Sequence, residues 1–299
     1  MKIKNDQDSA WKEILEINFK DFIDYCLPDL SKLIDWKKKW TSLDKELQAI
    51  TKGTEHGKRL VDKLFKVYLK DGTQQWILVH LEVQSQKEEA FPERMFVYSY
   101  RIYDKYKRMP VSCAILTDEN KKWRPNHFEL GLAGAQLGSK FLVVKLIDYQ
   151  NKTEELESSN NPFASVILVH LAALEAKRKP DQEKKRIKFA LTKRLYEKGY
   201  DKQQVVGLYK FIDWLIGLSE KLELEYLHEI HQLEEAKKMP YISRAERWAT
   251  EKGREEGVEK TREEIALNLL RQGTDIKFIA KVTGLKLEEI KRLKEKSKN

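Results

Sequence analysis

The chain has 299 residues, of which 41% are apolar and 35% charged, and this apolar content supports a substantial core and argues against general disorder. Its formal charge of +9 favours a polyanionic partner such as nucleic acid, although charged surfaces also occur in proteins that bind nothing acidic. Cys26 and Cys113 stand in apolar contexts typical of packing rather than of a disulfide or zinc site, so we expect a reducing cytoplasm. The sequence has no signal-like start and no apolar run of about 18 residues, so we expect neither secretion nor a membrane partner.

Strand-like alternation and helix-period stripes divide the first half of the chain into short elements. In chain order they are a helix at 10–26 that Pro28 ends, a short helix at 43–50, strands at 60–69 and 76–86, a helix at 89–108, and strands at 111–117 and 141–147. A glycine-containing connection joins the last two strands. This order predicts an α+β fold with one mixed sheet flanked by helices.

Helical patterns fill the chain from Pro162 onward. The predicted helices are 163–176, 183–197, 201–218 and 223–238. We therefore predict one domain over 1–243, with a helical extension from about residue 162. The highly charged stretch 244–264 predicts a linker or exposed helix, and 265–299 predicts a small tail resembling a helix-turn-helix. The tail has three open roles, namely sequence reading of DNA, phosphate contact and homo-oligomer packing through these C-terminal helices.

The two strands at 60–69 and 76–86 are joined by the turn pair Asp71-Gly72, and the length of the loop decides which residues share a face. A two-residue loop would place Asp62 on the face of Leu81 and turn Glu82 away. A three-residue loop with Gly72 in the left-handed conformation would place Asp62 opposite His80 and on the face of Glu82. We predict the three-residue loop.

Two carboxylates on one face favour a divalent cation, because Mg²⁺ prefers one or two carboxylates and completes its shell with water and phosphate oxygens. Asp62 and Glu82 are the main predicted ligands, and Glu46 in the preceding helix is a further candidate. Gln84, two residues after Glu82, would orient water or phosphate but cannot supply the positive charge of a lysine. The predicted chemistry is metal-assisted phosphodiester hydrolysis with Mg²⁺, or with Mn²⁺ or Ca²⁺ as alternatives. His80 is expected to pack rather than to bind metal.

A basic stripe runs along the predicted helix at 89–108, where Arg94, Tyr98, Arg101 and Lys105 share one face. This stripe could bind DNA phosphates or brace the acids. A solvated face above packed aromatic residues is the alternative.

Several segments together resemble one family of bacterial proteins. They are VDKLFKV at 61–67, ILVHLEVQSQ at 77–86, FPERMFVYSYRIYDKY at 91–106, VSCAILTDE at 111–119, NPFASVILVHL at 161–171, FIDWL at 211–215 and MPYISRAER at 239–247. The chain resembles, over nearly its whole length, the recombination-promoting nuclease and putative transposase (Rpn) family, which belongs to the PD-(D/E)XK nuclease superfamily.

This resemblance implies a restriction-endonuclease-like sheet and a Mg²⁺-dependent DNA endonuclease acting in recombination or in mobile-element and phage-related DNA metabolism. Asp62 and Glu82 match the acidic pair of the family, and Gln84 stands where the wider superfamily has lysine. The alternative is a catalytically weak or inactive DNA-binding protein on the same fold. Neither a Gly-x-Ser-x-Gly motif nor a phosphate-binding glycine loop occurs, so nucleophilic catalysis and ATP dependence are not indicated.

Overall fold

The structure is a computed structural model that describes residues 3–51, 62–82 and 89–242, and seven single residues between 266 and 290. At 3–9, 51, 62 and 80–82 it describes the backbone alone. The chain forms two compact units, Met1–Lys237 and Lys238–Asn299. In the second unit Ala266, Ile279 and Ile290 are buried together, whereas the predicted linker at 244–264 and the helix-turn-helix bend lie outside the described residues.

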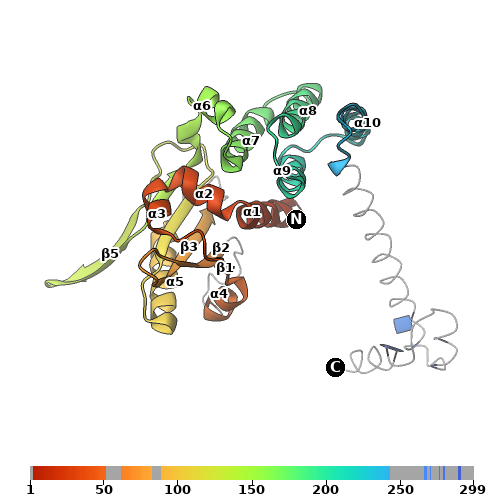
Figure 1. Ribbon diagram of the computed structural model, residues 1–299. Coiled ribbons are helices and arrows are strands. Elements are labelled where there is room, and N and C mark those ends of the chain that lie inside the picture. The colour runs from red at the N-terminus through yellow and green to blue at the C-terminus, as the bar shows by residue number, and fades with distance from the viewer. Residues whose placement is uncertain are drawn as a thin grey trace. The chain divides into compact units, whose positions relative to one another are not determined.

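A five-stranded mixed sheet forms the centre of the first unit (Figure 1). Its strands, in spatial order, are β1 (Thr41–Ser42), β2 (Asp62–Tyr68), β3 (Gln74–Glu82), β4 (Val111–Leu116) and β7 (Leu142–Lys145). β1, β2 and β3 pair antiparallel, whereas β3, β4 and β7 pair parallel. Parallel neighbours need a long crossover, and α5 connects β3 to β4 in this way. The predicted α+β class with one mixed sheet is confirmed.

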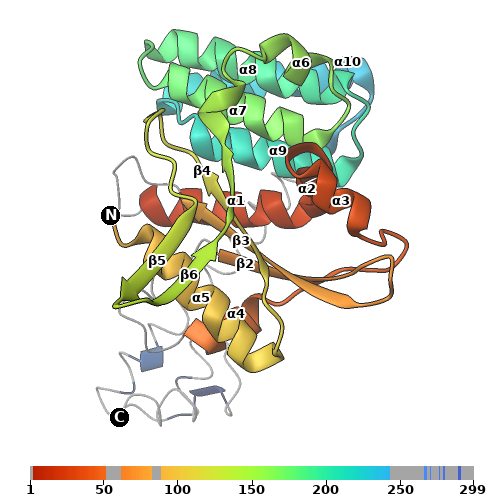
Figure 2. The same cartoon turned by 90° about the vertical axis from the view of Figure 1, so that its left-hand side faces the viewer.

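Helices surround this sheet and build a separate helical layer (Figure 2). They are α1 (Ile3–Ile17), α2 (Phe19–Cys26), α3 (Pro28–Leu33), α4 (Asp44–Thr51), α5 (Phe91–Tyr106), α6 (Thr153–Ser158), α7 (Pro162–Ala176), α8 (Asp181–Glu197), α9 (Lys202–Leu215) and α10 (Glu220–Lys237), with a 3₁₀ turn at Leu146–Tyr149. The predicted helices at 43–50 and 89–108 and the four helices after Pro162 are confirmed with small shifts of their ends.

Both faces of the β2–β3 pair are buried. On one face Leu64 and Leu78 pack with Leu47 of α4 and with Tyr98 of α5. On the other face Phe65 stacks on Phe19 of α2, with ring centroids 3.8 Å apart. Helices therefore cover the sheet on both sides, and the acids predicted for the first face share it with core residues.

The predicted hairpin register is confirmed. Asp62 pairs with His80 and Tyr68 pairs with Gln74, which leaves Lys70, Asp71 and Gly72 as a three-residue loop after the Leu69–Thr73 contact. Gly72 has φ +86°, a left-handed conformation that costs a residue with a side chain about 1–2 kcal/mol. The side chain of Asp71 accepts a hydrogen bond from the Thr73 backbone at 2.8 Å and closes the loop.

The prediction of one helix at 10–26 is wrong in one respect, because the structure divides it into α1 and α2 at Asn18. The backbone of Asn18 leaves the helical region (φ −113°, ψ 31°), and its side-chain amide donates to the Ile14 carbonyl at 3.0 Å. Pro28 follows the end of α2 as predicted but also begins α3, since a first helical residue needs no backbone N–H donor.

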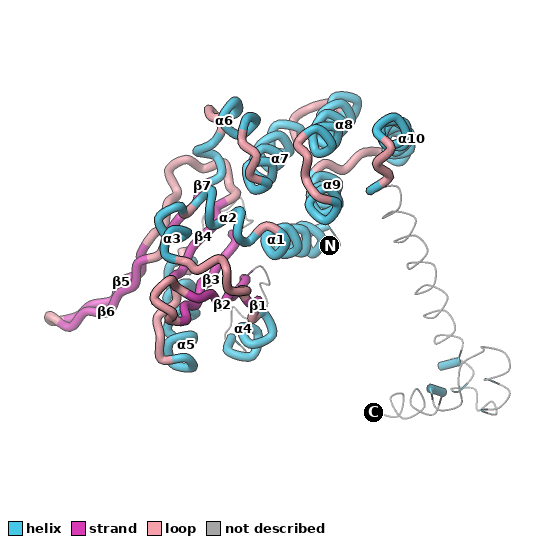
Figure 3. The backbone as a smooth tube through the Cα atoms, in the orientation of Figure 1, coloured by secondary structure: helices cyan, strands magenta, loops and turns pink. Residues whose placement is uncertain are grey.

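The connection between the last two predicted strands contains a hairpin that the sequence analysis missed. Its strands are β5 (His127–Leu132) and β6 (Ala135–Lys140), which pair only with each other and form a second sheet. The ribbon extends away from the body of the first unit (Figure 3). The last predicted strand, 141–147, is shorter in the structure, because β7 ends at Lys145 and a 3₁₀ turn follows.

Candidate functional site

The backbone register brings the positions of the two predicted acids to one face and one edge of the sheet. Asp62 begins β2 opposite His80, and Glu82 lies two residues beyond His80 at the end of β3. Such diagonal neighbours on one face lie about 7–8 Å apart, a span that two carboxylates can bridge through one cation. The side chains of Asp62, His80 and Glu82 and the whole of Gln84 lie outside the described residues.

Three parallel strands end at the same edge as the acids. Glu82 of β3 is level with Leu116 of β4, and Leu116 is level with Lys145 of β7. We call this row, with Asp62, the acid edge. In open α/β sheets ligands bind outside the carboxyl ends of the strands, so the acid edge is the part of the sheet best placed for a substrate.

The start of α4 is anchored beside Asp62. Lys63 is 3% exposed, and its ammonium contacts Glu16 of α1 at 2.6 Å and Asp44 of α4 at 2.5 Å. The Leu43 amide also donates to the Leu64 carbonyl at 2.7 Å. These contacts hold the first turn of α4 next to the strand position that follows Asp62.

Glu46 lies in this first turn and is half-buried. Leu47, the next residue, packs on the same sheet face as Leu64 and Leu78, so α4 covers the face to which positions 62 and 82 belong. Glu46 is therefore placed on an element next to the acid pair, as a third metal ligand would require.

The predicted basic stripe of α5 divides into two parts. Arg94 and Tyr98 are 3% and 2% exposed, and the Arg94 guanidinium lies over the ring of Phe91 at 5.4 Å. These two residues belong to the interface of helix and sheet, not to a solvated face. Arg94 is in the first turn of α5, whose Phe91 packs with Leu116 at the acid edge, and so its position suits a bracing role.

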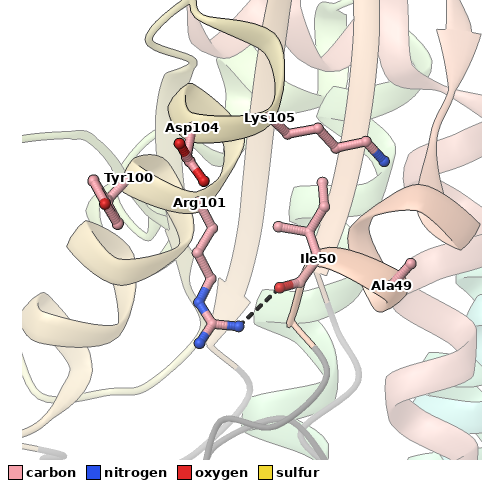
Figure 4. Close-up of a pocket in the computed structure, with 6 residues that line it drawn as sticks. All are labelled: Ala49, Ile50, Tyr100, Arg101, Asp104 and Lys105. Carbon is pink, nitrogen blue, oxygen red and sulfur yellow. Dashed lines mark hydrogen bonds between the residues drawn. The ribbon is translucent and has the colours of Figure 1, made fainter.

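Arg101 and Lys105, further along α5, line a pocket between α5 and α4 (Figure 4). The pocket has a volume of about 490 Å³. Its lining residues are Ala49, Ile50, Tyr100, Arg101, Asp104 and Lys105. Arg101 donates to the Ile50 carbonyl at 2.8 Å, so it holds the last turn of α4 while its guanidinium borders the pocket. Arg101 is about 10 Å along the helix from Arg94, which separates the pocket from the acid edge.

A buried ion pair at the ends of β4 and β7 was not predicted. Lys145 and Asp118 are in contact at 2.5 Å, with side chains 1% and 3% exposed. The ammonium also lies 5.6 Å from the ring centre of Trp123. A lysine inside the apolar run FLVVKLI signals such a pair, since a buried cation needs a counter-charge. The pair ties the loop after β4 to the end of β7.

His170 fixes α7 to the loop after β4. Its Nε2–H donates to the Thr117 carbonyl at 3.0 Å, and its ring lies 5.7 Å from that of Trp11. Burial lowers the pKa of His170 to about 4, so the imidazole is neutral at physiological pH. This histidine is a structural element behind the acid edge.

Other site chemistries find no support among the described side chains. Cys26 and Cys113 are free thiols, and burial raises the pKa of both, to about 12 for Cys26, so neither is a thiolate nucleophile or a ready metal ligand. Within the described ranges no three side chains from His, Cys, Asp and Glu cluster as a metal site, and Asp62 and Glu82 are not among the side chains in those ranges. Among the helices described, none has the length and apolar character needed to cross a bilayer.

Comparison with known proteins adds no relative, since no family model, no curated protein and no solved structure matches the chain. The candidate site is thus defined by its own residues, namely the acid edge with Glu46 and Arg94 beside it, and the Arg101 and Lys105 pocket further along α5.

Proposed function

We propose that this protein is a Mg²⁺-dependent endonuclease that hydrolyses phosphodiester bonds in DNA. The register that places positions 62 and 82 diagonally on one face, at the carboxyl edge of the sheet, supports this proposal most directly. The sequence resemblance to the Rpn family of the PD-(D/E)XK superfamily adds the biological setting, which is bacterial recombination or mobile-element and phage-related DNA metabolism.

In this proposal Asp62 and Glu82 hold the cation, and Glu46 is the third candidate ligand from α4. Carboxylate oxygens are the donors that hard cations prefer, so the residues fit Mg²⁺, and they also fit Mn²⁺ or Ca²⁺. When bound, the cation would polarise the scissile phosphate and lower the pKa of a bound water. Gln84 would orient that water or a phosphate oxygen through its amide.

Substrate binding in this proposal relies on positive charge. The chain has a formal charge of +9, and Arg101 and Lys105 border an open pocket on the sheet face of the acids. These two residues would contact backbone phosphates, which supply most of the non-specific affinity for DNA. Arg94 is a buried residue in the first turn of α5, and it would keep that helix in place at the acid edge.

A plasmid-nicking assay with the full chain tests the catalytic proposal. Asp62→Asn and Glu82→Gln remove the charges with little change of shape, and each is expected to reduce Mg²⁺-dependent nicking by about 100-fold or more. Glu154→Gln makes the same chemical change at an exposed residue of the first turn of α6 and is the matched control. Circular dichroism spectra establish that each variant is folded. Nicking that persists in both acid variants would remove these residues from the mechanism.

The second candidate function is DNA binding without efficient cleavage, and the glutamine at position 84 favours it. Mobility-shift titrations at several salt concentrations distinguish the two. Arg101→Gln or Lys105→Gln is expected to weaken binding and to reduce the salt dependence by about one counterion for each variant. Retardation of DNA without any Mg²⁺-dependent nicking would favour the binding protein over the nuclease.

A further inference from the structure

The β5–β6 hairpin has an apolar face that is largely exposed to solvent. Ten consecutive residues, 129–138, are exposed, although eight of them form strand. Leu130, Leu132 and Leu137 are 56%, 84% and 55% exposed. A two-stranded ribbon is marginal on its own in water, so a ribbon with three solvent-exposed leucines gains from a partner.

The two faces of this ribbon differ in character. Leu130 pairs with Leu137 and Leu132 pairs with Ala135, so these four residues share one face. On the opposite face Gln136 donates a hydrogen bond to Glu129. The ribbon is thus amphipathic, as a strand pair with one buried face would be, but its apolar side is exposed from Leu130 to Leu137.

The apolar face continues from the ribbon onto α5. Phe128 has the same parity as Leu130, and its ring stacks on that of Phe96 with centroids 5.2 Å apart. Phe96 in turn lies 6.4 Å from Tyr100, which is 55% exposed. We call the combined surface the hairpin patch, and it consists of Phe96, Tyr100, Phe128, Leu130, Leu132 and Leu137.

Charge distinguishes between the possible occupants of the hairpin patch. Residues 128–139 contain one acid, Glu129, and neither lysine nor arginine nor histidine. A ribbon that bound DNA or an anionic membrane would need basic side chains to contact the phosphate groups. A second copy of the chain has the opposite requirement, because two molecules of charge +9 repel each other and can approach best where neither has a net positive surface.

We propose that the hairpin patch binds the same patch of a second copy of this chain. The contact is isologous, with the apolar ribbon faces packed against each other around a two-fold axis. The ribbon projects from the body, so two copies can meet there while their charged bodies stay apart (Figure 1). A six-residue ribbon is about 20 Å long, which gives less than the standard buried area of about 800 Å² per partner and predicts a weak, micromolar dimer.

Sedimentation equilibrium of the full chain, from about 1 to 500 µM, tests this proposal over the range in which a micromolar dimer dissociates. We expect a reversible monomer–dimer equilibrium. Leu132→Glu combined with Leu137→Glu is expected to raise the dissociation constant by about 100-fold or more, because it buries charges in the contact. Leu224→Glu, at a leucine of α10 that is 64% exposed, is the matched control and is expected to dimerise like the wild type.

Each other outcome overturns the proposal. A wild type that stays monomeric at the highest concentration rules out a second copy as the occupant, and a dimer that the double substitution leaves unchanged must form elsewhere. Co-sedimentation with neutral and anionic lipid vesicles is measured in parallel. Vesicle binding by a monomeric wild type that the double variant loses would assign the patch to a membrane surface instead. Thermal unfolding curves show whether the variants remain folded.

Discussion

β2–β3 and β5–β6 are both antiparallel hairpins, yet their surroundings are opposite. The first is covered by helices on both faces, and Leu64, Phe65 and Ile77 are completely buried. The second leaves 129–138 exposed. Hairpin geometry alone therefore says little about a role, since the covered pair positions the acid edge whereas the uncovered pair exposes an apolar face to solvent.

Equivalent truncations in the two hairpins should give the largest difference. Leu78→Ala in β3 removes a fully buried side chain and is expected to lower the free energy of unfolding by roughly 3–5 kcal/mol. Leu137→Ala in β6 removes one that is 55% exposed and is expected to change it by less than about 0.5 kcal/mol. Urea unfolding of both variants, at a protein concentration that keeps the chain monomeric, measures the two changes in the free energy of unfolding. Similar losses would mean that the β5–β6 ribbon belongs to the cooperative core.

The packing of α7 against the loop after β4 should make the stability of the first unit depend on pH. His170 of α7 is buried and neutral, and its pKa falls from 6.5 to about 4 on folding. The unfolded chain therefore binds more protons between these values, so stability is complete above about pH 6.5 and decreases as the pH falls toward 4, by roughly 3 kcal/mol. Thr117 and Trp11 contact the ring, and the charge of Lys177 contributes to lowering the pKa.

His170→Gln is the variant that isolates this term, because an amide can still donate to the Thr117 carbonyl but does not titrate. Unfolding free energies at pH 7.5 and pH 5 should differ less in this variant than in the wild type. His127, an exposed histidine of β5, supplies the control His127→Gln, which is expected to leave the pH dependence unchanged. An equal pH dependence in His170→Gln and wild type would contradict a neutral buried imidazole.

A smaller contrast is expected at the two loops, which offer a matched pair of glycines. Gly72 and Gly134 have φ +86° and +85°, and a methyl group at either position would meet no atom within 4 Å. Alanine should therefore cost about 1 kcal/mol of backbone strain at each. At Gly72 the strain should appear in global unfolding, whereas at Gly134 it should appear only as faster amide exchange in β5 and β6. A global loss at Gly134 would break the contrast between the hairpins.

Sequence reasoning predicted the covered hairpin because several physical constraints agree there. Both strands alternate, Gly72 is placed where a three-residue loop needs a left-handed residue, and only one loop length puts Asp62 and Glu82 on the same face. The β5–β6 ribbon was missed because its short strands contain glycines and have no buried face to produce a strong pattern. Hydrophobic periodicity in a sequence reflects which side chains are buried, and an uncovered ribbon buries few of them.

The features of the candidate site also differ in how far the sequence could predict them. The acid positions follow from strand parity, which is local, and their shared face was predictable. Other features of the site depend on residues that are distant in sequence. They are the Lys63 contacts, the pocket of Arg101 and the Asp118–Lys145 pair. The helix stripe at 89–108 was seen, but its division into a buried part and a pocket part requires the position of α4, which no spacing in α5 encodes.

Lys63 has a mechanical consequence for the first unit. Its one ammonium contacts Glu16 of α1 and Asp44 at the start of α4, the helix that packs on the Leu64 side of the sheet. This single cation therefore couples α1 and α4 at the margin of the sheet, one residue from Asp62, so the positions of the two helices depend on each other. A displacement of α1 would remove the Glu16 carboxylate from the Lys63 ammonium, and Asp44 of α4 would then be the one remaining counter-charge of these two.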